Sequence, residues 1–231
     1  MSKILWDKPG ERRFETGVDH GVLYRRNKTT GVYNLGYAWN GLTAVTEAPS
    51  GAEATPMYAD NIQYLNLVSV EKFGATIEAF TYPDEFEFCD GTLELAPGIQ
   101  VGQQARETFG FHYRTKIGND LVGQDAGYKL HLVYGALAAP TQKARATVNE
   151  SPEAMPFSWE ITTTPVEIGT VGGVTYAPVA HLTVNSMTVS SLDLVALETI
   201  LYGVDGTGNP ATGAVLPRMP FPAELVTLFA A

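Results

Sequence analysis

The stretch Phe109-Gly-Phe-His-Tyr-Arg-Thr-Lys-Ile117 decides the fold class, because it has the clearest alternation of apolar and polar side chains in the chain. Successive residues of a β-strand point to opposite faces of a sheet. This segment is therefore predicted to be a strand with one face in the core. The apolar face carries Phe109, Phe111, Tyr113 and Ile117, and the other face carries His112, Arg114 and Lys116.

A second alternating run, residues 128–134, places Lys129 and His131 opposite a row of leucine and tyrosine side chains. The polar segment between the two runs, residues 118–127, suits a long hairpin connection. We therefore expect the two runs to pair as antiparallel strands.

Six further segments are rich in β-branched and aromatic residues and are bounded by Gly, Pro, Asn or Asp, which is typical of strands. Several of them carry apolar side chains on both faces. Either a second layer of the same chain or a neighbouring subunit must then cover them. The six segments are residues 21–26, 33–45, 62–70, 75–82, 157–164 and 179–187.

Two helices are expected near the C-terminus. Residues 190–203 begin with a Ser cap, place Leu194, Leu197 and Leu201 on one stripe, and end at a glycine. Residues 222–229 begin with proline, which is favoured at the first position of a helix. A shorter turn is expected after Pro83.

The composition is typical of a folded chain and does not favour strong binding to nucleic acid. Of the 231 residues, 45% are hydrophobic and 17% are charged, which differs from the pattern of disordered chains. The net charge of −10 disfavours a surface that grips phosphates. No stretch resembles a signal peptide or a membrane span, so we expect synthesis in the cytoplasm and no membrane contact. The lone Cys89 is expected to be a buried structural thiol.

Two long segments do not resemble hairpin turns. Residues 46–60 carry two prolines and exceed the length that chain reversal needs, so they are expected to form a contact loop. Residues 203–220 are rich in Gly and Pro and are expected to form an arm that leads to the terminal helix. Without a repeat or a shift in composition, residues 1–231 are expected to form a single domain.

The sequence gives only weak evidence for a catalytic or metal-binding site. The acidic cluster of Asp84, Glu85, Glu87 and Asp90 is a possible pair of glycosidase carboxylates, but a capped turn with solvated charges is the preferred interpretation. His112 and His131 are possible metal ligands on paired strands. The basic residues expected on the same face would repel a cation, so a polar face or a subunit contact is preferred. The common nucleotide, hydrolase and metalloprotease motifs are absent from the sequence. No catalytic residue, metal or cofactor is therefore expected.

Several segments resemble major tail proteins of long-tailed, non-contractile bacteriophages. The resemblance begins with Trp6-Asp-Lys-Pro-Gly-Glu-Arg-Arg-Phe and extends over nearly the whole chain. The segments that carry it are residues 6–24, 39–56, 64–86, 128–138, 157–160 and 194–203.

The resemblance implies a mainly β, tail-tube-type sandwich or barrel with a flanking α-helix near the C-terminal part. Copies would form hexameric rings whose inner strands join into one large β-barrel. The rings would stack into a hollow tube of the virion tail, assembled in the host cytoplasm, through which DNA passes without specific binding. Partners would be other copies, a tail-tip or distal tail protein, the tape measure protein and the tail terminator. Residues 1–30 would be an N-terminal arm and residues 203–231 a C-terminal arm.

The resemblance also gives residues 46–60 a role in stacking between rings or subunits. We expect the lumen to be net negative, since a basic lining would bind DNA. We also expect His112, Arg114, Lys116 and Lys129 to face away from it or to pair with acids between subunits. The expected contact residues are Glu47, Pro49, Ser50, Glu53, Pro56, Met57 and Tyr58.

Three other functions remain open. The inner tube of a contractile tail or secretion system would use the same fold and ring assembly. A carbohydrate-binding or adhesin β-sandwich on a virion surface would use exposed Trp and Tyr residues as a platform for sugars. An enzyme based on the acidic cluster is the least favoured.

Overall fold

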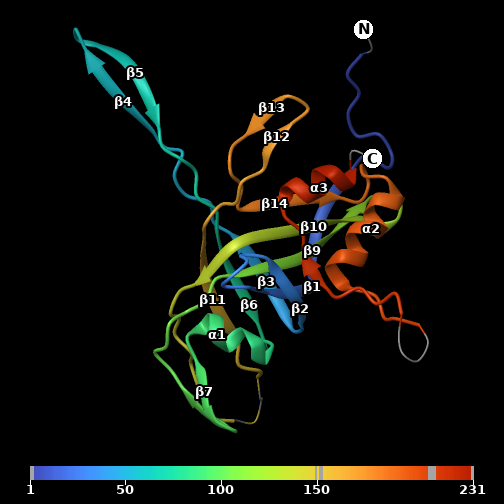
Figure 1. Ribbon diagram of the computed structural model, residues 1–231. Helices are drawn as coiled ribbons and strands as arrows, with labels where there is room; N and C mark the ends of the chain where they lie inside the picture. Colours follow the sequence, from blue (N-terminus) through green and yellow to red (C-terminus); the bar gives the residue numbers. More distant parts are fainter. Residues whose placement is uncertain (1–2, 149, 151–152, 208–211, 230–231) are drawn as a thin grey trace.

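A computed structural model of the chain describes residues 3–148, 150, 153–207 and 212–229 (Figure 1). The two alternating runs form neighbouring strands at the centre of a nine-stranded antiparallel sheet, as expected. They are β9 (Phe109–Asn119) and β10 (Gly123–Ala138), and the turn between them is only residues 120–122. The fold is mainly β, which confirms the coarse fold prediction.

The sheet has the strand order β15-β2-β1-β9-β10-β11-β6-β3, and β14 pairs with the first part of β10. No closed barrel is present in the described residues, because β3 pairs only with β6. The remaining strands of this sheet are β1 (Arg13–Arg26), β2 (Tyr33–Trp39), β3 (Leu42–Glu47), β6 (Gly74–Ala79), β11 (Phe157–Thr163), β14 (His181–Asn185) and β15 (Arg218–Met219).

Residues 33–45, predicted as one strand, form two strands that lie far apart in the pairing order. The chain leaves β2 through the turn at Asn40 and Gly41 and enters β3 at the other end of the sheet. Gly41 has a φ of 74°, a conformation that glycine adopts without steric cost. The prediction of one continuous strand is therefore wrong. Because this short turn joins β2 to β3, the sheet curls so that its two ends come together.

A second bend lies in β10. Residues up to Val133 pair with β14, whereas residues from Ala136 onward pair with β11. Between them, Gly135 has a φ of 58°, and a Cβ atom there would lie 2.2 Å from the carbonyl oxygen of Thr164. Only glycine fits this position, and the bend lets one strand serve two parts of the sheet.

The chain itself covers both faces of the central strands. A curled core lies inside the curve of the sheet, and a helix-side core lies on the outer face. Buried residues of the curled core include Trp39, Ile77, Phe86, Phe111 and Trp159. Those of the helix-side core include Tyr24, Leu132, Tyr134, Leu197 and Leu201.

The observed helices agree closely with those predicted from the sequence. The main helix α2 (Ser191–Tyr202) is capped by Ser190, whose side chain accepts a hydrogen bond from the Asp193 amide, and it buries the expected leucine stripe. The terminal helix α3 is Pro222–Phe229, as predicted. The turn after Pro83 comprises the 3₁₀ helix η1 (Asp84–Phe86) and α1 (Glu87–Asp90). No helix in the described ranges is long and apolar enough to cross a membrane.

Three small hairpins lie outside the sheet, and the first projects furthest from the body (Figure 1). They are β4 (Ala54–Ala59) with β5 (Ile62–Val68), β7 (Leu93–Ala96) with β8 (Ile99–Val101), and β12 (Gly169–Val171) with β13 (Val174–Tyr176).

Three expected segment boundaries change. The N-terminal arm is shorter than residues 1–30, because β1 enters the sheet at Arg13. Residues 46–60 are not an irregular loop, because β3 continues to Glu47 and β4 begins at Ala54. The C-terminal segment joins the body, since β15 pairs with β2 and Leu225 of α3 is buried in the helix-side core.

The leucine stripe of α2 gives a stability prediction. Leu197 is fully buried and Leu192 on the same helix is 82% exposed. Leu197→Ala should lower the free energy of unfolding by about 2–5 kcal/mol, because it leaves a cavity in the core. Leu192→Ala should change it by less than about 0.5 kcal/mol. Urea unfolding of both variants checks this, and equal effects would contradict the burial of this stripe.

Candidate functional site

Four strands form a layer with two open edges. The order in this layer is β1, β9, β10 and β14. Residues 13–16, 18 and 19 of β1 pair with β9 on one side but not with β2, whose pairing begins at Gly21. On the far side of the layer, β14 has no second strand partner within the described ranges. Unpaired edges of this kind are ready to pair with another chain.

The backbone of β14 is oriented for such pairing. The Ser186 amide donates to the Tyr128 carbonyl at 3.0 Å, and the Tyr134 amide donates to the Ala180 carbonyl at 2.8 Å. Hydrogen-bonded and non-hydrogen-bonded pairs alternate along an antiparallel ladder. The Thr183 amide therefore points away from β10, toward the open edge.

The basic residues of the layer pair with acids of the same chain. Arg114 donates to both carboxylate oxygens of Asp19, at 2.7 and 2.8 Å, and these hydrogen bonds lower the pKa of Asp19. The Lys129 ammonium lies 2.5 Å from a carboxylate oxygen of Glu15. Partners for these two residues are thus found within one subunit.

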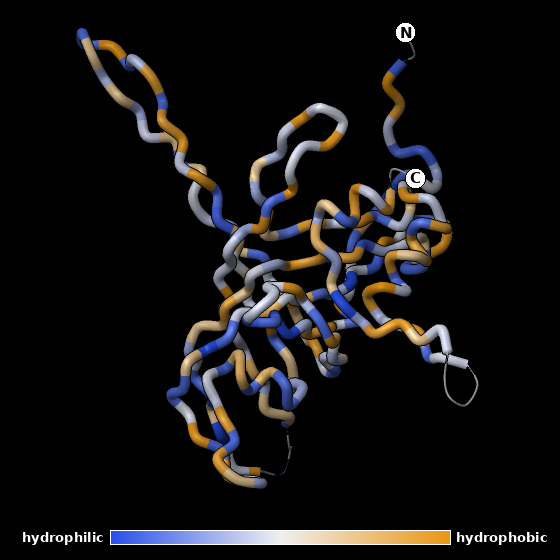
Figure 2. The backbone as a smooth tube through the Cα atoms, viewed as in Figure 1, coloured by the Kyte–Doolittle hydropathy of each residue, from blue (hydrophilic) through white to orange (hydrophobic). Residues whose placement is uncertain are grey.

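The hairpin of β4 and β5 is exposed along its whole length, and hydrophobic residues recur on both strands (Figure 2). Tyr58 is 70% exposed, Tyr64 68% and Leu67 56%. An isolated two-stranded hairpin has little stability of its own, and exposed apolar patches mark interaction surfaces. This hairpin is the strongest candidate for a contact with another protein.

Most of the expected contact residues lie on or beside this hairpin. Pro56, Met57 and Tyr58 are in β4, and Glu53 immediately precedes it. Pro49 and Ser50 lie at its root, where the Ser50 backbone pairs with that of Lys72. Glu47 differs, because it ends β3 and faces two histidines of the main sheet.

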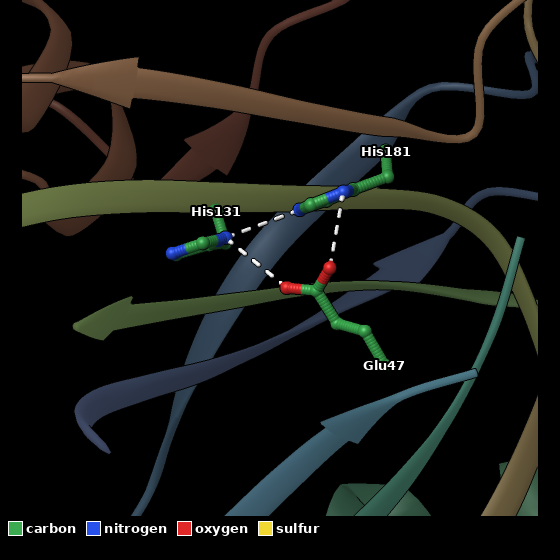
Figure 3. A group of neighbouring side chains, drawn as sticks. All are labelled: Glu47, His131 and His181. Carbon is green, nitrogen blue, oxygen red and sulfur yellow. Dashed lines mark hydrogen bonds and ion pairs between the residues drawn. The ribbon is translucent and has the colours of Figure 1, made fainter. Parts of the chain in front are cut away.

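Glu47, His131 and His181 point toward one another from β3, β10 and β14 (Figure 3). The His131 Nδ1 atom lies 3.1 Å from His181 Nε2 and 3.6 Å from Glu47 Oε1. Burial lowers the pKa of His131 to about 4 and also lowers the pKa of His181. Both imidazoles are therefore neutral at neutral pH, with lone pairs that can bind a proton donor or a cation.

The prediction that His112 and His131 share a face is wrong. In the observed register Leu132 lies opposite His112 and Tyr113 lies opposite His131, so the two histidines occupy opposite faces. His112 is fully buried in contact with the hydroxyl of Tyr202, 2.9 Å from its Nε2 atom. Arg114 and Lys116 share its face, whereas Lys129 shares that of His131.

The acidic cluster forms a turn, but the expectation of a capped turn with solvated charges is wrong in two respects. No side chain of the described residues caps η1 or α1 by a hydrogen bond. Asp90 is buried and pairs with Arg106 and Lys143. Glu87 accepts a hydrogen bond from Gln100. Cys89 is buried beside them, as predicted, and burial raises its thiol pKa to about 12.

The sequence matches no protein-family model, and no curated protein is significantly similar to it.

The hairpin side chains should be dispensable for folding. We predict that Tyr58→Ser, Tyr64→Ser and Leu67→Ser together lower the free energy of unfolding by less than about 1.5 kcal/mol, because each side chain is largely exposed. The control Leu132→Ser alters a fully buried side chain and should cost more than about 2 kcal/mol. Urea unfolding measures both, and loss of the fold in the triple variant would show that the hairpin packs on its own subunit.

Burial of His112 predicts a pH dependence of stability. Burial lowers its pKa to about 3 in the folded chain, whereas an unfolded histidine titrates near about 6.5. Below that pH the unfolded chain takes up a proton that the folded chain excludes, so the free energy of unfolding should fall by up to about 1.4 kcal/mol per pH unit. Urea unfolding between pH 7 and 5 checks this. His112→Gln should have a shallower slope, and parallel slopes would rule out this contribution.

Proposed function

We propose that this chain is the structural subunit of a phage tail tube of the long-tailed, non-contractile type. The observation that carries the proposal is the four-stranded layer with an open edge on each side. The overall resemblance of the sequence to major tail proteins supports the same function. In this role the chain performs no catalysis and needs no cofactor.

Strand directions support ring formation. Each pair in the layer is antiparallel, so β1 and β14 run in opposite directions. When β14 of one copy lies beside β1 of the next, the antiparallel alternation continues across the boundary. A repeated contact between two different edges gives a ring when the rotation closes, and a closed barrel leaves no open edge. Six copies per ring follow from the resemblance to tail proteins.

The projecting hairpin provides a second contact, between rings or neighbouring subunits. Its apolar side chains would leave water when they pack on another copy, which favours stacking by about 25 cal/mol per Å² of apolar surface buried. Expected contacts there are Glu53, Pro56, Met57 and Tyr58, with Pro49 and Ser50 at the root. The tube ends would contact the tail-tip or distal tail protein, the terminator and, inside, the tape measure protein.

The charge distribution suits passage of DNA through the ring. The register places Lys129 on the face opposite to His112, Arg114 and Lys116, so these four side chains cannot all line one bore. With the helices outside, the bore would be lined by the part of the Lys129 face that the curled core leaves exposed. Lys129 would then face the bore, contrary to the expectation, and Glu15 would balance its charge. A lining without excess positive charge does not hold the phosphate backbone.

Negative-stain electron microscopy of the purified chain tests the proposal. Wild type should form rings or tubes. Thr183→Pro should remain folded by circular dichroism and fail to form them, because proline removes the outward amide of β14. Thr183→Val keeps that amide and should assemble. A wild type that remains a monomer, or a monomer that binds glycans, would refute the proposed function. Tubes that form equally well from the proline variant would refute the contact through the β14 edge.

A further inference from the structure

Three side chains from separate strands place two imidazoles and a carboxylate around one point. The ligand atoms of Glu47, His131 and His181 all lie within 4.8 Å of one another. Two of the distances between them are 3.1 and 3.6 Å. A tetrahedral zinc ion with bonds of about 2.0–2.2 Å separates its ligand atoms by about 3.3 Å. Small side-chain adjustments would bring the three donors into this geometry.

The neighbouring charges permit a cation at this point. Arg114 and Lys116, the residues expected to repel one, lie on the other face of the sheet. Lys129 does share the face of His131, but it pairs with Glu15. A divalent ion would add positive charge beside two carboxylates, Glu47 and Glu15. Glu47 is also 39% exposed in its side chain, so an ion can reach it from solvent.

Other residues hold the donors in position. The Tyr113 hydroxyl donates to Glu47 Oε1 at 2.6 Å, and its ring stacks on His131. The Thr115 hydroxyl lies 3.0 Å from Nε2 of His131, the nitrogen that faces away from the cluster. The Phe73 ring stacks on His181 at 4.5 Å between centroids. Metal-binding histidines commonly have a hydrogen-bond partner on the second ring nitrogen, and Thr115 occupies that position for His131.

We propose that Glu47, His131 and His181 bind a divalent transition-metal ion of the zinc type, with water as the fourth ligand. The ion would join β3, which lies at one end of the strand order, to the neighbouring strands β10 and β14. Glu47 is the last residue of β3, immediately before the root of the projecting hairpin. Binding would therefore fix the point from which the hairpin extends. The inference rests on the side-chain geometry alone and does not depend on the proposed assembly.

Metal titration of the full chain, free of affinity tags and treated with a chelator, tests this site. Calorimetry with zinc chloride should show one ion per chain. Cobalt chloride should produce the intense visible absorption of a tetrahedral site with mixed nitrogen and oxygen ligands. Zinc should also raise the melting temperature.

Two variants and one control distinguish the site from surface binding. His181→Ala and Glu47→Gln should each weaken zinc binding at least tenfold and remove the cobalt absorption. Glu47→Gln retains an acceptor for Tyr113, so the fold should survive in this variant even if His181→Ala does not fold. The control His20→Ala removes a half-exposed histidine outside the cluster and should bind as wild type. Absence of stoichiometric binding in wild type, or unchanged binding in Glu47→Gln, would overturn the proposal.

Discussion

The antiparallel register of β9 and β10 determines which side chains share a face, and both cores depend on it. Leu132 lies opposite His112 and therefore enters the helix-side core, while His131 lies beside Tyr113 on the other face. A shift of one residue would exchange these positions and put His131 among the leucines of α2. The pairing of β1 with β9 and of β14 with β10 makes β1 and β14 the outer strands of the layer. The two cores and the histidine cluster depend on the β9–β10 register.

Folding and the proposed assembly use separate parts of the molecule. The large buried aromatic residues lie in the two cores, which are complete within one chain. The hairpin of β4 and β5 contributes no described residue to these cores. The strand β14 contributes Val184 to the helix-side core, but its open edge consists of backbone groups such as the amide of the exposed Thr183. A subunit with this division can fold first and join other copies afterward, and changes at the contact surfaces need not cost stability.

Local patterns predict most of the elements correctly. Alternation identifies β9 and β10, and the Ser190 cap with its leucine stripe identifies α2, because these signals lie within a few residues. The corner at Gly41 was missed, since residues 33–45 form one run with apolar or aromatic side chains on both faces. The faces of His112 and His131 were misjudged because register depends on the turn, which occupies residues 120–122 and is much shorter than expected. Glu47 was expected to make contacts, but its meeting with His181 depends on the curl of the sheet, for which no local signal exists.

The burial of Cys89 has a practical consequence for handling the protein. A thiol with a pKa near 12 has almost no thiolate at neutral pH, and the thiolate is the nucleophile that attacks alkylating reagents and disulfides. Cys89 is the only cysteine of the chain, so native molecules should resist covalent cross-linking by oxidation. Reagents can reach it only when the curled core opens. The rate at which the Cys89 thiol is modified therefore reports how often the curled core opens.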